Sequence, residues 1–273
     1  MTTTLFKDRT KYILIFFIFL ISLSAHSQVA VDSSYRLPLN EKLHYRVYYR
    51  LAGIWVYAAF ANFKTDTMTL EGRNVYKLYV EAFTRKKYNW VYSLEDHYTS
   101  YTDRKTFKPL KFEEYNIEKG ITYHNIYNFL WDKDSINIVV SQSNKDTVKF
   151  SKKLPEFITD SYSAVHYLRL WDFSKFKVGD TLRYKTILTG RIFDQEIIYH
   201  GKEMVTDKKG NKVEAFKLEA LVKNSSFFRA DKGIFVWIAN NKARWIIKVD
   251  AKIVVGSIFV YLDQPELVSF DRQ

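Results

Sequence analysis

Residues 43–49 read LHYRVYY, with Leu, Tyr, Val and Tyr at the odd positions. This alternation is typical of a β-strand that buries one face. Runs of comparable composition, separated by turn-like sequences such as DKKGN at 207–211, predict further strands along the whole chain. We expect strands at residues 54–63, 74–85, 93–101, 109–117, 121–130, 135–141, 146–150, 181–189, 192–204, 212–221, 233–239, 244–254 and 256–262.

The composition agrees with a β protein. The chain holds 20 Tyr, 21 Phe and 6 Trp but only 9 Gly and 4 Pro, and aromatic residues suit a pleated, half-buried surface. We therefore predict a mainly all-β fold, a strongly curved antiparallel sheet that forms a half-open or closed barrel-like structure. A transmembrane barrel is disfavoured, because Lys and Arg fall on both faces of segments 74–87 and 109–119.

One segment follows a helical period instead. Between Asp160 and Trp171 the apolar residues lie at positions 164, 165, 167, 168 and 171. We predict a single central helix over residues 159–171, with Thr159 or Asp160 as its N-cap. Asp160, Arg169 and Trp171 are expected to have structural roles, as cap, as cation near the C-terminal end and as buried anchor.

The two halves of the chain resemble each other. The motif EKLHY at 41–45 resembles GDTLRY at 179–184, and further matches keep an offset near 135–140 residues. This order predicts a single domain over residues 41–265, built from pseudo-repeats at 41–150 and 175–265 with the helix between them.

The N-terminus has the pattern of a secretory signal peptide. Three basic residues between positions 7 and 11 precede the apolar run 12–23, and small residues at 24, 25 and 27 offer a cleavage site. We predict a signal peptide at 1–27, with an uncleaved anchor as the alternative, and a loose polar leader at 28–40. No later run is long and apolar enough to span a bilayer as a helix. The chain is expected to be exported and soluble, in the periplasm or associated with the outer envelope.

The absence of Cys limits the kinds of site that the protein can contain, and its positive charge limits the classes of partner. Without any Cys the protein has no disulfide or thiolate site, and it is not a lipoprotein. The formal charge is +12, which in an exported protein favours lipid, lipopolysaccharide or glycan of the cell envelope over nucleic acid.

Five stretches together resemble the DUF3108 family of exported bacterial proteins of unknown function. They are Glu41–Val47, Asp96–Pro109, Asp160–Arg169, Val178–Asp180 and Asp231–Leu262. Trp245 stands where such proteins tend to have Pro. The resemblance implies an envelope β protein and supplies no catalytic residue.

No constellation predicts catalysis. Asp96, His97 and Asp103 lie close in sequence, but neighbouring strand residues face opposite sides. Ser163 and His166 lie three apart on the expected helix, without a G-x-S-x-G elbow. We expect no metal, no cofactor and no catalytic residue.

The aromatic excess is the strongest functional signal, with a simple aromatic core as its alternative. We predict a non-enzymatic protein that binds an amphipathic or anionic envelope component on an aromatic-rich concave face. The alternatives are an exported hydrolase acting on glycan or ester, and a structural scaffold of an envelope complex. The candidate ligand-binding residues are Tyr45, Tyr49, Trp90, Tyr92, Tyr98, Tyr101, Phe235 and Trp237.

Overall fold

The computed structural model describes residues 30–90, 93–118, 120–207, 210–221 and 233–266. The signal-peptide prediction lies outside these residues. The described strands are β1 (Glu41–Leu51), β2 (Ile54–Leu70), β3 (Arg73–Thr84), β4 (Leu94–Asp103), β5 (Pro109–Glu118), β6 (Ile121–Leu130), β7 (Ser135–Gln142), β8 (Val148–Lys153), β9 (Thr159–Asp160), β10 (Thr181–Leu188), β11 (Arg191–Thr206), β12 (Lys212–Leu221), β13 (Ile234–Ala239), β14 (Ile246–Lys252) and β15 (Ser257–Glu266).

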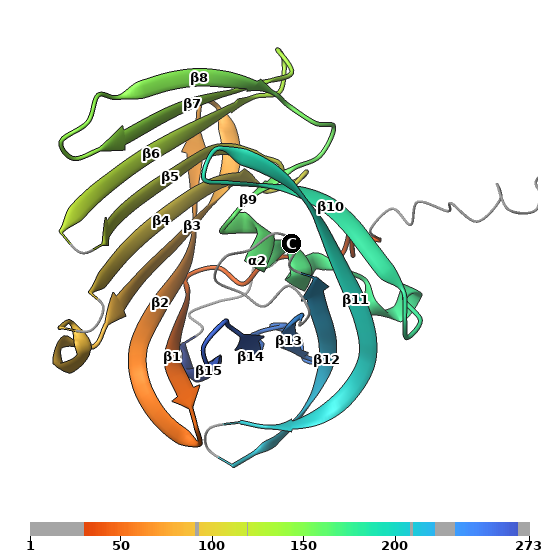
Figure 1. The fold of residues 1–273 in the computed structure, drawn as a ribbon. Helices are drawn as coiled ribbons and strands as arrows, with labels where there is room; N and C mark the ends of the chain where they lie inside the picture. Colours follow the sequence, from red (N-terminus) through yellow and green to blue (C-terminus); the bar gives the residue numbers. More distant parts are fainter. Residues whose placement is uncertain (1–29, 91–92, 119, 208–209, 222–232, 267–273) are drawn as a thin grey trace, which may run out of the picture.

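These strands form one strongly curved sheet (Figure 1). Its order is β8-β7-β6-β5-β4-β3-β2-β1-β15-β14-β13-β12-β11-β10-β9, so the first and last strands of the domain pair at its centre. Neighbours are antiparallel except β9, which runs parallel to β10. The sheet is not closed, because β8 and β9 remain as edges. The predicted fold class is confirmed in its half-open form.

The strand order sets two similar series side by side. Strands β1–β6 and β10–β15 each form a six-stranded meander, and the second strand is the longest in both, with 17 residues in β2 and 16 in β11. A duplication of the chain would give this arrangement. A common origin of the two halves stays a prediction.

The alternation in β1 works as expected. Leu43 and Tyr45 are buried, whereas the side chains of His44 and Arg46 lie on the opposite face and are half-buried. The buried face looks into the curve of the sheet, toward a short helical segment that Figure 1 shows inside this curve. We call this face the inner face.

The prediction of one helix over 159–171 is wrong in its extent. Thr159–Asp160 form β9, and the chain then makes α2 (Ser163–Tyr167), the 3₁₀ turn η2 (Leu168–Leu170) and the 3₁₀ turn η3 (Phe173–Lys175). The helix is short because both of its ends are tied to other segments: Asp160 pairs with β10, and the Leu170 carbonyl accepts a hydrogen bond of 2.7 Å from the Asp32 amide. We call residues 161–176 the plug.

Asp160 does satisfy the start of the helix. Its Oδ1 accepts hydrogen bonds from the amides of Tyr162 and Ser163 at 3.0 and 2.7 Å. Its Oδ2 accepts a further bond of 2.6 Å from the Ser100 hydroxyl of β4. The side chain is fully buried and therefore links the plug to the inner face of the sheet.

The expectation of a loose leader is wrong for its described part, residues 30–40. Leu37 is completely buried, and Val31 forms an isolated bridge with Trp171 of the plug. Asp32 forms an ion pair of 2.5 Å with Arg244. These contacts fix the segment against the plug because they supply burial, backbone pairing and charge together.

The plug closes one end of the curved sheet. Its Tyr167 stacks on Phe107 of the β4–β5 turn, and its Phe173 stacks on Phe216 in the middle of β12, with ring centroids 4.1 Å apart. The β1–β2, β3–β4 and β14–β15 turns lie at the opposite end of the strands, because successive antiparallel strands alternate in direction. We call this second end the open end.

Candidate ligand-binding site

The inner face of the sheet is lined by aliphatic side chains. Directly paired residues of neighbouring strands share a face, so the register identifies two rows. The row nearer the plug consists of Val47, Val260, Val249, Val236 and Leu218. The row nearer the open end consists of Tyr49, Ile258, Ala251, Ile234 and Ala220.

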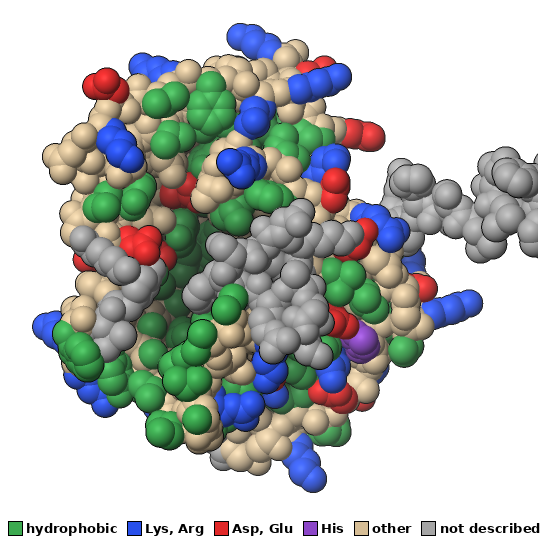
Figure 2. Space-filling view, viewed as in Figure 1, with side chains coloured by type: hydrophobic (Ala, Val, Ile, Leu, Met, Phe, Trp, Pro, Cys, Tyr) green, Lys and Arg blue, Asp and Glu red, His purple; other side chains and the backbone are tan. Residues whose placement is uncertain are grey.

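Burial changes along these rows. In the row nearer the plug, Leu218 is fully buried, whereas Val47, Val260 and Val249 are only partly buried. In the row nearer the open end, every member except Ala251 is partly buried. Some of these inward-facing residues stay partly accessible to solvent. They therefore line a space that the core does not fill. We call this space the lumen. Figure 2 shows a hollow on one face of the molecule with hydrophobic side chains on its walls.

Small residues widen the lumen on the side of β2 and β3. Ala59 pairs with Val47, and Ala61 pairs with both Tyr45 and Ala82. Three alanines in place of large side chains leave room beside the two rows. The small side chains thus give this part of the inner face a concave, aliphatic surface.

A polar strip continues the inner face into β4–β6. Asp96 pairs with Ala82 on one side and with Asn116 on the other. Asn116 donates a hydrogen bond of 3.2 Å to the Tyr98 hydroxyl. The buried Glu114 accepts bonds of 3.0 and 2.9 Å from Asn125 and from the Tyr127 hydroxyl.

Burial perturbs both carboxyl groups of this strip. Desolvation raises the pKa of Asp96 to about 6, a hydrogen bond from Tyr98 and the nearby His97 oppose the shift, and the Glu118 carboxylate adds to it. Desolvation also raises the pKa of Glu114, against the hydrogen bonds from Asn125 and Tyr127. The strip therefore presents carboxyl groups that take up protons more readily than exposed ones.

The pKa of Asp96 gives a prediction for stability. Below about pH 4 the Asp96 carboxyl is protonated in both the folded and the unfolded protein, so it does not lower the free energy of unfolding. Above pH 6 the folded state must hold a partly desolvated negative charge, which lowers the free energy of unfolding. Wild type should therefore lose stability relative to Asp96→Asn as pH rises from about 4 to 6.5. Since the side chain is only partly buried, the loss should be on the order of 1 kcal/mol.

Urea denaturation at several pH values measures this difference. The exposed Asp146→Asn is the matched control and should follow wild type throughout. Parallel stability curves of wild type and Asp96→Asn over this range would contradict the assignment.

The structure separates the predicted aromatic site residues. Tyr45 and Tyr98 lie on the inner face, and Tyr49 lies in the inner row nearer the open end. Tyr101 lies three residues after Tyr98 in the same strand and therefore faces the other side.

Phe235 and Trp237 also lie on the outer face, alternating with the inward Val236. There the Lys217 ammonium lies 5.2 and 5.4 Å from the two rings. Trp90 is 85% exposed beyond β3, and Tyr92 lies outside the described residues. Apart from Tyr49, the two rows that line the lumen are aliphatic. The period-two alternation within each strand is the sequence signal that places these residues on the inner face.

The residues considered for catalysis do not converge. The Ser163 hydroxyl accepts a bond from the Asp160 amide, and His166 contacts Tyr162 and Arg169 instead of Ser163. Asp103 accepts bonds from the amides of residues 105 and 106 in an exposed turn. Within the described residues, no group of three His, Asp or Glu side chains is arranged to hold a metal ion.

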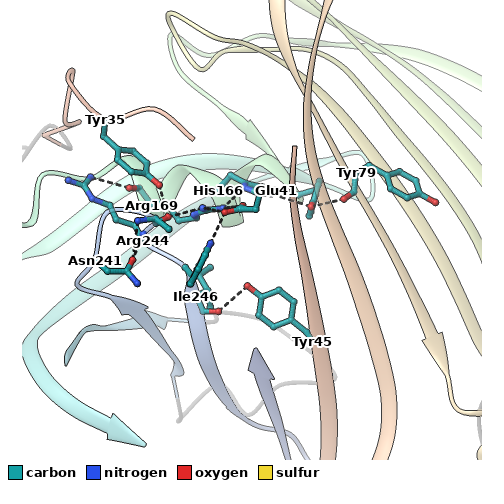
Figure 3. Close-up of polar contacts among 12 residues, drawn as sticks. Tyr35, Glu41, Tyr45, Tyr79, His166, Arg169, Asn241, Arg244 and Ile246 are labelled. Atoms are coloured by element: carbon teal, nitrogen blue, oxygen red, sulfur yellow. Dashed lines mark hydrogen bonds and ion pairs between the residues drawn. The ribbon is translucent and has the colours of Figure 1, made fainter. Parts of the chain in front are cut away.

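A buried charged network joins the plug to the sheet (Figure 3). Arg169 of η2 donates to both carboxylate oxygens of Glu41, at 2.7 and 2.8 Å, and to the Ala243 carbonyl at 2.9 Å. The side chains of Arg169 and Glu41 are only 2% and 1% exposed. Arg169 lies in the last turn of η2, and its guanidinium forms an ion pair with the first strand.

Neutral side chains complete this network. Burial, reinforced by the Arg169 charge, lowers the pKa of His166 well below its usual range, so the ring stays neutral. Its Nδ1 lies 3.3 Å from Arg169 and its Nε2 lies 3.1 Å from the Tyr162 hydroxyl, which in turn donates to the Tyr79 carbonyl. Trp245, the residue that departs from the resembled family, donates a bond of 2.8 Å to Glu41. The side chains of Glu41, Arg169 and His166 at the centre of this network are buried.

The fold and the lumen define a half-open, β-barrel-like protein with an internal plug. The DUF3108 family, described as proteins of unknown function, matches residues 44–263, and the chain belongs to this family. A search of curated proteins finds no significant match.

A solved structure supports the fold. The crystal structure of a β-barrel-like protein of the domain of unknown function DUF1849 from Brucella abortus is similar with a TM-score of 0.56 and 9% identity, over 86% of this chain and 100% of that chain. At this identity the similarity concerns the fold alone. No helix in the described ranges has the length and apolar character needed to cross a membrane.

Proposed function

We propose that this protein is a non-enzymatic binding protein that holds the acyl chain of an amphipathic lipid in its lumen. The observation that carries the proposal is the pair of mainly aliphatic rows, most of whose members stay partly exposed. Apolar surface of this kind gains free energy when a ligand removes it from water, at about 25 cal/mol per Å².

The lining favours an acyl chain over a glycan. Sugar rings stack on aromatic faces, whereas valine, isoleucine and alanine side chains of the two rows offer a surface that matches methylene groups. The lipid head group would lie toward the polar strip, which begins one strand from Ala82. There the Asn116 side-chain oxygen is buried without a hydrogen-bond partner in the described part of the chain and can accept a bond from a ligand hydroxyl.

The N-terminal pattern and the charge support a place in the cell envelope. A basic segment followed by an apolar run and small residues is the pattern of export, and the formal charge of +12 favours anionic partners. We propose that the protein works outside the cytoplasm, where lipid, lipopolysaccharide and glycan are its potential ligands.

Filling the lumen should abolish ligand binding. Val260→Trp places a large side chain in the inner row at a partly buried position, where it competes with an acyl chain for the same space. Binding of a fluorescent long-chain fatty acid, measured by titration, should weaken at least about tenfold, the effect of losing roughly 1.4 kcal/mol of binding free energy. Met204→Trp, at a side chain that is 59% exposed, is the control and should bind as wild type does.

Native mass spectrometry of the protein purified from an envelope extract provides the complementary test. We expect a population carrying a lipid-sized adduct in wild type and in Met204→Trp, and its loss in Val260→Trp. A clean unliganded mass for wild type, together with no fatty-acid binding, would exclude the lipid-binding function.

A further inference from the structure

The open end of the sheet displays exposed apolar side chains on three turns. Exposed fractions are 69% for Ile54 and 47% for Trp55, which begin β2 directly after the β1–β2 turn, and 65% for Val254 and 58% for Val255 in the β14–β15 turn. Trp90, 85% exposed, follows the 3₁₀ turn η1 (Lys86–Tyr88) after β3. Side chains of this size at turn tips do not contribute to the core, so their apolar character calls for another explanation.

The β14–β15 turn adjoins the β1–β2 hairpin, and the η1 segment contacts β2. A Cβ atom on Gly256, whose φ is +88°, would lie 2.6 Å from the Arg50 carbonyl oxygen, so the β14–β15 turn packs directly on the β1–β2 hairpin. The Tyr49 hydroxyl donates a bond of 3.0 Å to the Val255 carbonyl across the same contact. The Arg85 guanidinium lies 4.3 Å from the ring of Tyr57 and joins the η1 segment to β2.

The three segments that carry these side chains have charges of one sign. Segments 50–55, 85–90 and 252–257 read RLAGIW, RKKYNW and KIVVGS, with five basic residues and no acidic one. The Arg50 guanidinium lies 5.2 Å from the Trp55 ring and 5.0 Å from the Phe259 ring, and the side chains of Lys86 and Lys87 are exposed. Cations therefore surround the tryptophan and aliphatic tips.

We infer that this open-end surface docks on an anionic lipid bilayer. Tryptophan and aliphatic side chains enter the interface between head groups and acyl chains, and Lys and Arg beside them bind anionic head groups. The surface has both features on adjoining turns, whereas a glycan or a nucleic acid would leave the aliphatic tips in water. Docking in this orientation sets the mouth of the lumen against the bilayer.

Vesicle cosedimentation of the protein, purified as the producing cell leaves it, tests the inference. Wild type should bind vesicles with 30% phosphatidylglycerol at least about tenfold more tightly than vesicles of phosphatidylcholine alone, and lose this preference in high salt. Ile54→Ser/Trp55→Ser should weaken binding to the anionic vesicles about tenfold or more. Lys86→Glu/Lys87→Glu should remove most of the preference for anionic lipid.

The matched control lies away from this surface. Val178→Ser/Met204→Ser removes two side chains that are 71% and 59% exposed, and should bind the anionic vesicles as wild type does. Equal binding by Ile54→Ser/Trp55→Ser and wild type would overturn the inference, including the case in which the apolar run 12–23 holds the chain on the vesicle. Light scattering that shows a dimer abolished by Ile54→Ser/Trp55→Ser would assign the surface to self-association instead.

The inference is independent of lipid binding in the lumen, and the two fail separately. Val260→Trp should dock on vesicles normally while losing the fluorescent fatty acid. Ile54→Ser/Trp55→Ser should keep the fatty acid while losing the vesicles.

Discussion

Trp171→Ala is expected to lower the free energy of unfolding by about 3–5 kcal/mol, the range for deleting a buried aromatic side chain. Trp171 is completely buried, and its ring centroid lies 6.1 Å from those of Tyr167 and Phe176 and 6.3 Å from that of Tyr184. The substitution would leave a cavity where the plug, the sheet and the leader segment meet.

Trp171→Phe should cost clearly less than Trp171→Ala. The indole Nε1 has no hydrogen-bond partner within the described residues, so phenylalanine removes an unsatisfied donor while keeping most of the ring contacts. Urea denaturation followed by far-UV circular dichroism measures both variants. Trp90→Ala, at an 85% exposed side chain, is the control and should stay within about 0.5 kcal/mol of wild type. A Trp171→Ala midpoint equal to that of Trp90→Ala would mean that the plug does not stabilise the fold.

The strands were predictable because a sheet with one buried face imposes a period of two on the sequence. In β1 the odd positions Leu43 and Tyr45 are buried as expected, and β11 and β12 on either side of residues 207–211 form an antiparallel pair. The pairing of β1 with β15 was not predictable in this way. It joins residues more than 200 positions apart, and nothing in either strand alone specifies that partner.

The length of the helix was overestimated because the segment 159–171 combines a short strand with a short helix. Val165 and Leu168 face the core from a short helix, but Thr159 and Asp160 are buried as a strand beside β10. A cap-like composition followed by apolar residues does not distinguish these cases, since Asp160 accepts amide hydrogen bonds in either backbone conformation.

The candidate site was only partly predictable. Its aromatic residues were selected by composition, and composition cannot say which face of a strand a residue occupies. Tyr98 and Tyr101 differ in parity and lie on opposite faces, and the outward Trp237 lies beside Lys217. The two rows follow from parity within each strand, but their alignment into one lumen depends on the register between five strands.

Breaking the buried ion pair is the second large effect. Arg169→Met should destabilise the protein by about 3–5 kcal/mol, because it leaves the Glu41 carboxylate buried without its cation. Glu41→Gln should also be destabilising, because it leaves the Arg169 guanidinium buried without its anion. Trp245 then remains as the partner of residue 41, and the Ala243 carbonyl remains as the partner of Arg169. Urea denaturation of each variant at pH 7 measures these losses.

The double variant shows whether the Glu41–Arg169 pair stabilises the fold or only selects the position of the plug. Glu41→Gln/Arg169→Met removes both charges, so it should be more stable than at least one single variant, with a coupling energy of about 2 kcal/mol or more. The exposed pair Lys185–Asp194, at 2.5 Å and with side chains 43% and 75% exposed, is the matched control. Lys185→Met should cost less than about 1 kcal/mol and couple weakly to Asp194→Asn.

Additive losses in the Glu41–Arg169 cycle would show that the pair contributes no interaction energy. Coupling with a double variant as stable as wild type would instead show that hydrophobic packing can replace the pair. In that case its role is to select one position of the plug, since the Arg169 guanidinium fits both Glu41 at the start of β1 and the Ala243 carbonyl between β13 and β14 in a single arrangement. Ligand binding by the double variant separates these roles further, because a displaced plug would narrow or open the lumen and change fatty-acid affinity without a change in stability.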